Sequence, residues 1–306
     1  MSNIGISVII PVKNGQRFLE LLLARVFSQR IKIPFEVIIV DSGSTDNTRT
    51  IAAGYPVRIY SIAEEDFNHG LTRNFVISKA KGTYIILLTV DALPYNENWM
   101  IKLIENLERD PAVAGAYSRQ IPREDANPIT KIRVNRFFTA SVVRRESKIE
   151  NLAEFELLAP HEKHLLCNFD NVSSCIRRDI WEKIPFPKTN FGEDIEWAMQ
   201  VLRAGYKIVY DPESIVYHSH DFSPWQWYKK NRVNSHKLCV LFGPHGTRSI
   251  PQLIVNVFAN TSRDLYCLYK NQRRFKNFLA SVYLVPLGAI FGAWGQYIGN
   301  RDTFRL

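Results

Sequence analysis

Short apolar runs alternate with helix-like segments through the first 110 residues, and this alternation limits the fold more than any other feature. The strand-like runs, rich in Ile and Val, are residues 6–11, 35–41, 57–60 and 84–89. Apolar residues at helical spacing occur in residues 16–29, 71–79 and 98–109, and residues 44–48 contain Ser, Thr, Asp and Asn, which cap helices. Runs of this composition are typical of strands buried on both faces. The pattern predicts βαβ units and an α/β fold around a mostly parallel sheet.

Length and cysteine content narrow the class of protein. The chain has 306 residues, 46% of them hydrophobic, which is enough for one large domain or a domain with an appendage. The start of the sequence has neither the basic region nor the cleavage pattern of a signal peptide, so we expect none. Four widely spaced cysteines without a CxxC pair indicate reduced thiols in a cytosolic protein rather than a disulfide or zinc framework.

The net charge of +9 is concentrated in the C-terminal part of the chain. Residues 222–306 contain twelve Lys or Arg and two Asp or Glu, whereas residues 1–221 contain 27 basic and 28 acidic residues. Such asymmetry indicates a polyanionic partner: a membrane surface, a nucleic acid or a phosphorylated substrate.

The alternation of strands and helices weakens between residues 117 and 167, where Pro122 and Pro128 interrupt it. We interpret this stretch as an insertion that faces the substrate. Beyond it the pattern predicts a strand leading into a helix, a longer helix and two short strands: residues 171–181, 193–204, 207–210 and 214–217.

Residues 277–300 carry no formal charge and are long enough to be considered as a membrane span. Pro286, four glycines and flanking basic residues favour an interfacial or docking helix instead. The pairs Gly288/Gly292 and Gly295/Gly299 either let another helix approach closely or only mark breaks in the helix.

Asp91 follows the apolar run 84–89 and precedes a proline by three residues. The carboxyl ends of parallel strands form the ligand-binding edge of open α/β sheets. Asp91 is therefore either a metal ligand or a turn residue.

Asp41 stands at the end of the second strand-like run. A carboxylate there can accept a hydrogen bond from a ribose hydroxyl or a base N–H. The Ser, Asp and Asn residues that follow also suit a turn and a helix cap, and locally that interpretation is favoured.

Residues 67–74 lead into a helix whose N-terminus favours anions, and Arg73 offers a fork for phosphate. An ordinary helix start with a solvated arginine accounts for the same residues.

Residues 190–196 begin another helix. Asn190 and Glu193 have the spacing of a capping box, and acidic residues in a first turn offset the helix dipole. The functional alternative makes Asp194 a general base in a cleft.

His218 and His220 follow a strand-like run and share one face if the chain stays extended. One of them could ligate a metal together with Asp91.

The order of these motifs resembles family 2 glycosyltransferases of GT-A fold over residues 5–220. The matching motifs are Ser7-Val-Ile-Ile-Pro-Val-Lys-Asn14, residues 36–48 with Asp41, Asp91, and Gly192-Glu-Asp194 before a helix. More narrowly, residues 67–74, 89–92 and 217–223 look like those of bacterial rhamnosyltransferases.

The resemblance implies roles for individual residues. The nucleotide-sugar pocket would be lined by Pro11, Val12, Asn14, Asp41, Ser42, His69, Arg73 and Asp91. Asp91 would hold Mg²⁺ or Mn²⁺ on the donor diphosphate, with His218 or His220 completing the coordination. Asp194 would deprotonate the acceptor hydroxyl, supported by Glu193, and the anomeric configuration would invert in one displacement.

Thr89 departs from the family pattern, which usually has Asp-x-Asp where this chain has Thr89-Val-Asp91. A single carboxylate leaves coordination positions for water or other groups, and Mg²⁺ commonly keeps several waters.

The favoured hypothesis is an inverting glycosyltransferase that moves rhamnose from dTDP-rhamnose to a saccharide, in particular a lipid-linked one. Residues 1–221 would form the GT-A domain, with a donor half (1–116) and an acceptor half (117–221). Residues 222–306 would dock on anionic lipids at the cytoplasmic face of the membrane, or mediate homo-oligomerisation.

The competing hypothesis, which Thr89 favours, is a non-catalytic GT-A module that binds a nucleotide or glycan. A nucleic-acid binder ranks last, because the basic segment lacks a recognised nucleic-acid motif. A sugar-nucleotide pyrophosphorylase should have a glycine-rich loop after the first strand, and residues 11–15 lack one.

Overall fold

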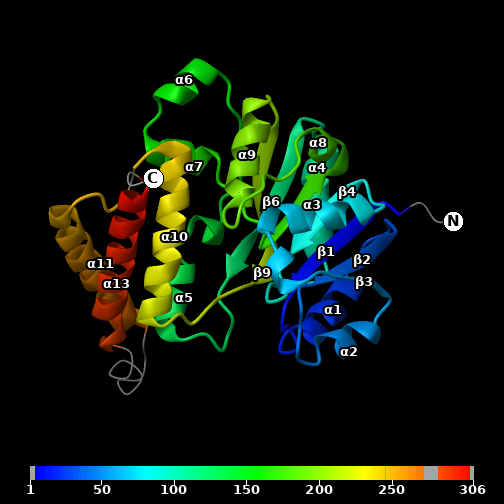
Figure 1. Cartoon of the computed structure of the whole chain (residues 1–306), viewed down its shortest axis with the longest axis horizontal. Coiled ribbons are helices and arrows are strands. Elements are labelled where there is room, and N and C mark those ends of the chain that lie inside the picture. The colour runs from blue at the N-terminus through cyan, green and yellow to red at the C-terminus, as the bar shows by residue number, and fades with distance from the viewer. Residues whose placement is uncertain (1–3, 245, 272–281, 304–306) are drawn as a thin grey trace. The chain divides into compact units, whose positions relative to one another are not determined.

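The computed structural model describes residues 4–244, 246–271 and 282–303, which form two compact units (Figure 1). Unit 1 comprises Met1–Ile121, Phe138–Leu152 and Cys167–His218. Unit 2 comprises Pro122–Phe137, Ala153–Leu166 and Ser219–Leu306. The stretch 117–167, expected to be an insertion, is thus divided between the units.

Unit 1 is built on a nine-stranded sheet in the order β3-β2-β1-β4-β8-β6-β9-β5, with β7 also paired to β9. The strands are β1 (Ile6–Val12), β2 (Phe35–Asp41), β3 (Val57–Ser61), β4 (Tyr84–Leu88), β5 (Leu93–Pro94), β6 (Val113–Ile121), β7 (Arg145–Ser147), β8 (Ser173–Arg177) and β9 (Lys207–Tyr217). The first four strand predictions are confirmed to within one residue at each end.

The helices of unit 1 also follow the predicted pattern. They are α1 (Leu19–Phe27), α2 (Thr48–Ala53), α3 (His69–Lys79), α4 (Trp99–Arg109), α8 (Arg178–Lys183) and α9 (Glu193–Arg203), with short 3₁₀ turns at Glu64–Asp66 and Phe138–Ala140. The apolar faces of α1 and α4 contribute Leu22, Val26 and Leu103 to the core beneath the sheet.

The sheet is mixed rather than mostly parallel. Strands β3, β2, β1 and β4 are parallel, as predicted, but β8 runs antiparallel to both β4 and β6. The sequence did not predict β6, because its small and polar residues lack a β-branched run. The two short strands predicted at 207–217 form the single strand β9, which contains an irregularity opposite Ser118 and Arg119.

Unit 2 is helical among its described residues. Its helices are α5 (Pro128–Val134), α6 (Leu152–Leu157, which starts at the unit boundary), α7 (Pro160–Leu166), α10 (Pro224–Phe242), α11 (Ile250–Asn271) and α13 (Leu284–Asp302). A reciprocal capping box between Ser223 and Gln226 starts α10. Pro286 lies in the first turn of α13, where backbone N–H groups have no acceptor within the helix, so the N–H that proline lacks is not missed.

Part of the predicted docking helix, residues 277–281, lies outside the described residues, as do the flanking Arg273, Arg274 and Lys276. Among the helices that are described, none has both the length and the hydropathy to cross a bilayer.

The glycines of α13 admit a neighbouring helix, as their spacing predicted, and that helix is α10 of the same chain. A Cβ on Gly295 would lie 2.4 Å from the carbonyl oxygen of Tyr228, and one on Gly299 would lie 2.3 Å from that of Arg232. Only glycine lets the two backbones approach this closely.

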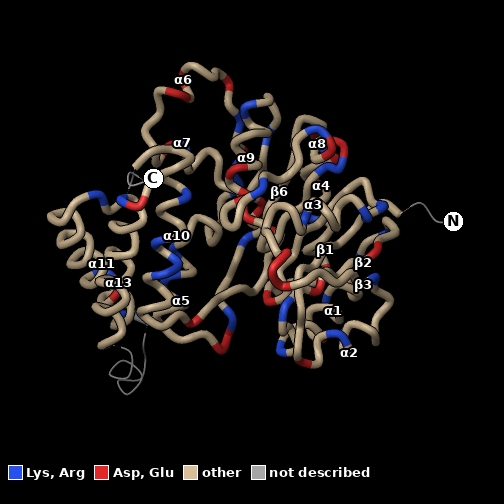
Figure 2. Tube along the Cα trace, viewed as in Figure 1, with Lys and Arg blue, Asp and Glu red and all other residues tan. Residues whose placement is uncertain are grey.

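The charge asymmetry follows the two units. Unit 1 contains 22 basic and 22 acidic residues, whereas unit 2 contains 17 and 8 and so carries the whole net charge. Figure 2 shows Lys and Arg residues along α10.

Candidate active site

The polar residues of unit 1 gather at one edge of the sheet because of the way its strands pair. Leu88, the last residue of β4, pairs with Ser173, the first of antiparallel β8. Residues just after β4 and just before β8 therefore share an edge. The parallel strands β6 and β9 end together, with Ile121 opposite Tyr217. This edge carries Asp91, Asp170, Asn171, Gln120 and His218.

Asp91 lies beside His218. Its Oδ2 is 3.7 Å from the Nε2 of His218, and both side chains are largely buried. The backbone around Asp91 does form a turn, in which Ala92 N–H donates to the carbonyl of Thr89. The turn and the ligand interpretations of Asp91 are thus compatible, because the turn is made by the backbone.

Gln120 sets the tautomer of His218. The amide nitrogen of Gln120 donates to Asp170 Oδ2 over 2.7 Å, so its oxygen faces His218 Nδ1, 2.8 Å away. That oxygen can only accept, so Nδ1 carries a proton and Nε2 faces the Asp91 carboxylate. A neutral His218 would present a lone pair to a carboxylate oxygen.

A divalent cation suits this pair. Two ligand atoms 3.7 Å apart can both bind a metal at the usual bond lengths of about 2.0–2.2 Å, and a second hydrogen bond that orients a ligating histidine is typical of metal sites. Carboxylate oxygen favours Mg²⁺ or Mn²⁺.

Thr89 adds a polar group next to this pair. Its hydroxyl is buried and has no hydrogen-bond partner among the described residues. An unsatisfied buried hydroxyl at this edge is a hydrogen-bonding position that a ligand can use.

His220 belongs to unit 2, where its ring stacks on Phe222 with the ring centroids 5.1 Å apart. It follows His218 by two residues, so the chain keeps their Cα atoms within about 7 Å of each other.

Asp194 and Glu193 occupy the first turn of α9 and are both held by Asn171. The backbone N–H of Asn171 donates to Asp194 Oδ2 over 3.2 Å, and its side-chain amide donates to Glu193 Oε1 over 3.1 Å. Asp194 is partly exposed, whereas Glu193 is buried.

The capping box expected between Asn190 and Glu193 does not form. The N-cap of α9 is Gly192, with φ +69°, and Asn190 instead accepts a hydrogen bond from the side chain of Asn68. Gly192 has the left-handed conformation that favours glycine, and Glu193, which follows it, pairs with Arg73.

The two carboxyl groups have opposite environments. Enclosure by protein atoms and the carboxylates of Glu193 and Asp170 raise the pKa of Asp194 well above that of an ordinary aspartate. Burial alone would raise the pKa of Glu193, but Arg73 and His69 outweigh it and hold that pKa below its usual value. Paired carboxyls whose pKa values are driven apart are typical of acid–base sites.

Arg73 is buried against Glu193, with a distance of 3.0 Å from its Nη1 to Glu193 Oε1. The helix start that contains it is capped by Asn68, whose side chain accepts from Leu71 N–H. A Cβ on Gly70 would lie 1.8 Å from the carbonyl oxygen of Pro187, so protein covers this helix end. Burial lowers the pKa of His69, although Glu193 opposes this effect.

The residues expected to line the nucleoside part of the pocket lie where β1 and β2 end side by side. Ser42 N–H donates to the carbonyl of Val12, and Asn14 Oδ1 accepts from Thr45 N–H. Asp41 is buried and accepts from Ser44 N–H, which is the turn interaction expected locally. Pro11 is half-buried at the end of β1, and Asn14 is exposed with φ +51°.

Asp170, Gln120 and Asn171 were missed at the sequence level, although they link Asp194 to the Asp91–His218 pair. Asp170-Asn171 directly before a strand was the available indication, since polar residues at a strand start reach the same edge when that strand runs antiparallel. The sequence contained no indication of the role of Gln120, because its strand, β6, was not predicted.

The sequence also matches a protein-family model. The model described as glycosyl transferase family 2 matches residues 7–175, which is more than half of the chain. The chain belongs to glycosyl transferase family 2. The family resemblance predicted from the motif order is therefore confirmed.

Curated relatives from Salmonella include two rhamnosyltransferases. The O-antigen chain rhamnosyltransferase WbaN of Salmonella anatum is 33% identical over 67% of this chain and 62% of its own length. The O-antigen chain rhamnosyltransferase RfbN of Salmonella typhimurium is 31% identical over 74% of this chain and 69% of its own length. The chain thus matches less than two thirds of WbaN.

Solved structures of a mannosyltransferase and a glucosyl-3-phosphoglycerate synthase share the fold. The alignment with a mannosyltransferase of Pyrobaculum calidifontis, in complex with GDP-Man and Mn²⁺, includes 98% of this chain and 86% of the mannosyltransferase chain. The sequence identity is 17% and the TM-score is 0.61. The alignment with the glucosyl-3-phosphoglycerate synthase of Mycobacterium tuberculosis, in complex with Mg²⁺ and UDP, includes 80% of this chain and 82% of the synthase chain. The sequence identity is 15% and the TM-score is 0.56. The predicted GT-A fold is confirmed.

Proposed function

We propose that this protein is an inverting glycosyltransferase that moves rhamnose from dTDP-rhamnose to a hydroxyl of a saccharide, in particular a lipid-linked one. The observation that carries the proposal is the Asp194–Glu193 pair, in which one carboxyl has a raised pKa and its neighbour a lowered one. A base with a raised pKa accepts a proton more readily near neutral pH.

The transfer is a single displacement at the anomeric carbon. The acceptor oxygen forms a bond to that carbon as its proton passes to the carboxylate of Asp194. The bond from the anomeric carbon to the donor diphosphate breaks, and the nucleoside diphosphate leaves with that electron pair. No covalent enzyme intermediate is needed.

Glu193 and Arg73 act through Asp194. The negative charge of Glu193, fixed by Arg73 and Asn171, contributes to the raised pKa of Asp194. We therefore assign Arg73 and His69 to positioning Glu193, in addition to the donor contacts expected from the resemblance.

Asp91 and His218 would hold Mg²⁺ or Mn²⁺, with His220 as a third ligand close by in the chain. The metal, when bound, neutralises charge on the departing diphosphate. The solved mannosyltransferase and synthase with Mn²⁺ or Mg²⁺ support a divalent ion in this fold. Gln120 holds the protonated Nδ1 of His218, which leaves Nε2 to the metal.

The donor pocket is proposed at the ends of β1 and β2, lined by Pro11, Val12, Asn14, Asp41 and Ser42. The choice of rhamnose comes from the relatives that are named rhamnosyltransferases.

A donor screen tests the proposal. Release of nucleoside diphosphate is measured with dTDP-rhamnose, UDP-glucose, UDP-galactose and GDP-mannose, each with Mn²⁺ and with EDTA. We expect dTDP-rhamnose with metal to give the fastest release. Faster release from another donor would contradict the sugar assignment.

Peripheral docking on an anionic membrane, at its cytoplasmic face, is part of the same proposal. It is supported by the net charge of unit 2 and by exposed apolar residues of α11 at helical spacing, namely Ile254, Val255, Phe258, Tyr266 and Tyr269. Sedimentation with anionic vesicles should fall when Val255 and Phe258 are both changed to Glu. Unchanged sedimentation would exclude this face.

Self-association through the C-terminal helices would need a surface other than the glycines of α13. Gly295 and Gly299 already pack against α10 of the same chain.

A further inference from the structure

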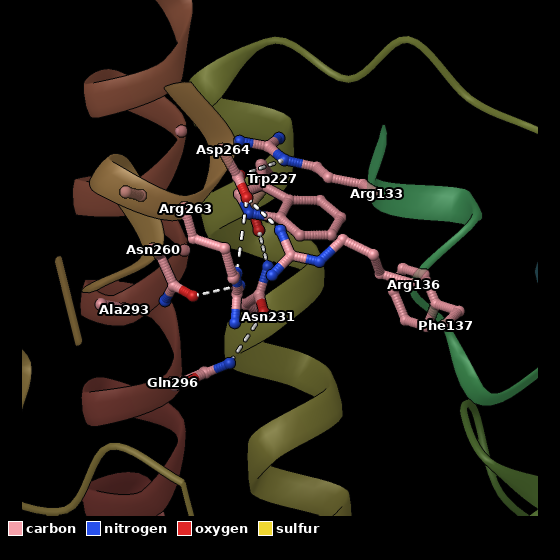
Figure 3. Close-up of a pocket in the computed structure, with 13 residues that line it drawn as sticks. Arg133, Arg136, Phe137, Trp227, Asn231, Asn260, Arg263, Asp264, Ala293 and Gln296 are labelled. Carbon is pink, nitrogen blue, oxygen red and sulfur yellow. Dashed lines mark hydrogen bonds and ion pairs between the residues drawn. The ribbon is translucent and has the colours of Figure 1, made fainter. Parts of the chain in front are cut away.

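Unit 2 contains a cavity of about 220 Å³ among α10, α11, α13 and the segment around α5 (Figure 3). Its polar lining includes three arginines and a single carboxylate: Arg133, Arg136, Arg263 and Asp264. Within this lining the positive charge exceeds the negative charge by two.

All three guanidinium groups converge on Asp264, which is 5% exposed (Figure 3). Arg136 donates directly to Asp264 Oδ1. The Nε atoms of Arg133 and Arg263 lie 3.8 Å and 3.7 Å from Asp264 oxygens, which is too far for a hydrogen bond. Arg136 is hydrogen-bonded to Asp264, whereas Arg133 and Arg263 form only longer ion pairs with it, so three guanidinium groups share one carboxylate.

Arg133 is one arginine of this cluster whose charge is destabilised by burial. Its side chain is 18% exposed, and its guanidinium lies over the Trp227 ring, 4.9 Å from the centroid. Burial lowers the pKa of Arg133, and Asp264 only partly opposes this. Concentrating cations in a half-buried space is unfavourable unless an anion compensates them.

The backbone of α13 is shaped around these side chains. A Cβ on Gly288 would lie 2.0 Å from Arg133 Nη2, and one on Gly292 would lie 2.6 Å from Trp227 Nε1. Asn231, Asn260 and Gln296 add side-chain amides to the lining (Figure 3). The amide nitrogens of Asn231 and Gln296 each donate one hydrogen bond within the protein, and an amide nitrogen has a second N–H to donate.

We propose that this cavity is an anion site that takes a phosphate or diphosphate group. Several guanidinium forks with additional amide donors match the geometry of phosphate oxygens. Arg133 and Gly288 also line a second cavity of about 310 Å³, which gives room for whatever the phosphate is attached to. The site uses none of the residues of the candidate active site, so it does not depend on the proposed transfer.

Calorimetric titration with inorganic diphosphate tests the site, with EDTA present so that metal-assisted binding in unit 1 does not contribute. Arg263→Gln removes one fork from a side chain that is 55% exposed, so this variant should fold. We expect it to weaken binding about tenfold, the usual consequence of losing a charged hydrogen bond. The matched control is Arg248→Gln, an exposed arginine of unit 2 that does not line the cavity, and it should bind as the wild type does.

Gly288→Ala gives a second test that keeps every charge. Its new methyl group displaces the Arg133 guanidinium, so binding should weaken although the net charge is unchanged. Equal binding by wild type, Arg263→Gln and Gly288→Ala would overturn the proposal.

Vesicles separate the two sources of the phosphate group. Wild type is sedimented with phosphatidylcholine vesicles that contain or lack phosphatidic acid. Loss of phosphatidic-acid-dependent sedimentation in Arg263→Gln but not Arg248→Gln would identify a lipid phosphate. Diphosphate binding without such a difference would identify a soluble one. Absence of both kinds of binding would overturn the site.

Discussion

The guanidinium of Arg73 and the carboxylate of Glu193 form an ion pair of 3.0 Å, with side chains only 6% and 5% exposed. Breaking a buried pair by removing one partner leaves an uncompensated charge and costs about 3–5 kcal/mol. Arg73→Met should therefore lower the free energy of unfolding by roughly that amount, measured by urea denaturation. The double variant Arg73→Met/Glu193→Gln should recover part of the loss. No recovery would show that the pair is not the cause.

The raised pKa of Asp194 predicts the acid limb of the pH–rate profile. Asp194 must be deprotonated to accept a proton, so kcat/KM should rise with pH through a pKa well above that of an ordinary aspartate. Asp170→Asn removes one of the carboxylates that raise this pKa, so the acid limb should move to lower pH. A shift to higher pH, or none, would contradict the assignment.

Asp194→Asn should separate activity from stability. Because its folded-state pKa is raised, the stability that Asp194 contributes at low pH is lost as pH rises through that value. At pH 7 the variant should therefore be more stable than wild type, by up to about 2 kcal/mol. Below the unfolded-state pKa the advantage should vanish. Its transfer rate should fall about 10²–10⁴-fold. Lower stability at pH 7 would contradict this electrostatic account.

Gln120→Leu should weaken metal dependence without touching a metal ligand. It removes the acceptor that fixes the proton on His218 Nδ1. Loss of such a supporting contact typically lowers metal affinity about 10–100-fold. Mn²⁺ binding followed by electron paramagnetic resonance measures this, with Gln252→Leu on α11 as the control. Identical Mn²⁺ affinities would exclude the role of Gln120.

Gly295→Ala tests the close contact between α10 and α13. The added methyl group would meet the carbonyl of Tyr228, and overpacking of this kind costs about 1–3 kcal/mol. Alanine's helix propensity, worth about 1 kcal/mol, offsets only part of that. Gly54→Ala, whose Cβ would lie 3.4 Å from its nearest neighbour, is the matched control and should change stability little. Equal thermal melts for both variants would contradict the contact.

The first half of the sheet could be predicted because β1, β2 and β4 are short, buried runs of large apolar residues that alternate with helix-like segments. The order of β6, β8 and β9 could not be predicted, since β6 consists of small and polar residues and its pairing depends on distant strands. The same limit applies to the site. Asp91 and Asp194 stand out locally, whereas Gln120 and Asp170 acquire their significance only when β6 and β8 bring them to one edge.

The burial of Arg73 could not be predicted from the sequence either. Its position near the start of a helix suggested either a fork for phosphate or a solvated arginine, and the fold buries it against Glu193. A pairing across 120 residues leaves no local pattern.

The most direct measurement is the release of nucleoside diphosphate from dTDP-rhamnose with Mn²⁺ by wild type, Asp91→Ala and Asp194→Ala, each first shown to be folded. We expect turnover by wild type and its loss in both variants. Wild-type protein that releases no nucleoside diphosphate from any donor, or variants that turn over as fast as wild type, would contradict it, and the former result would indicate a non-catalytic binding module.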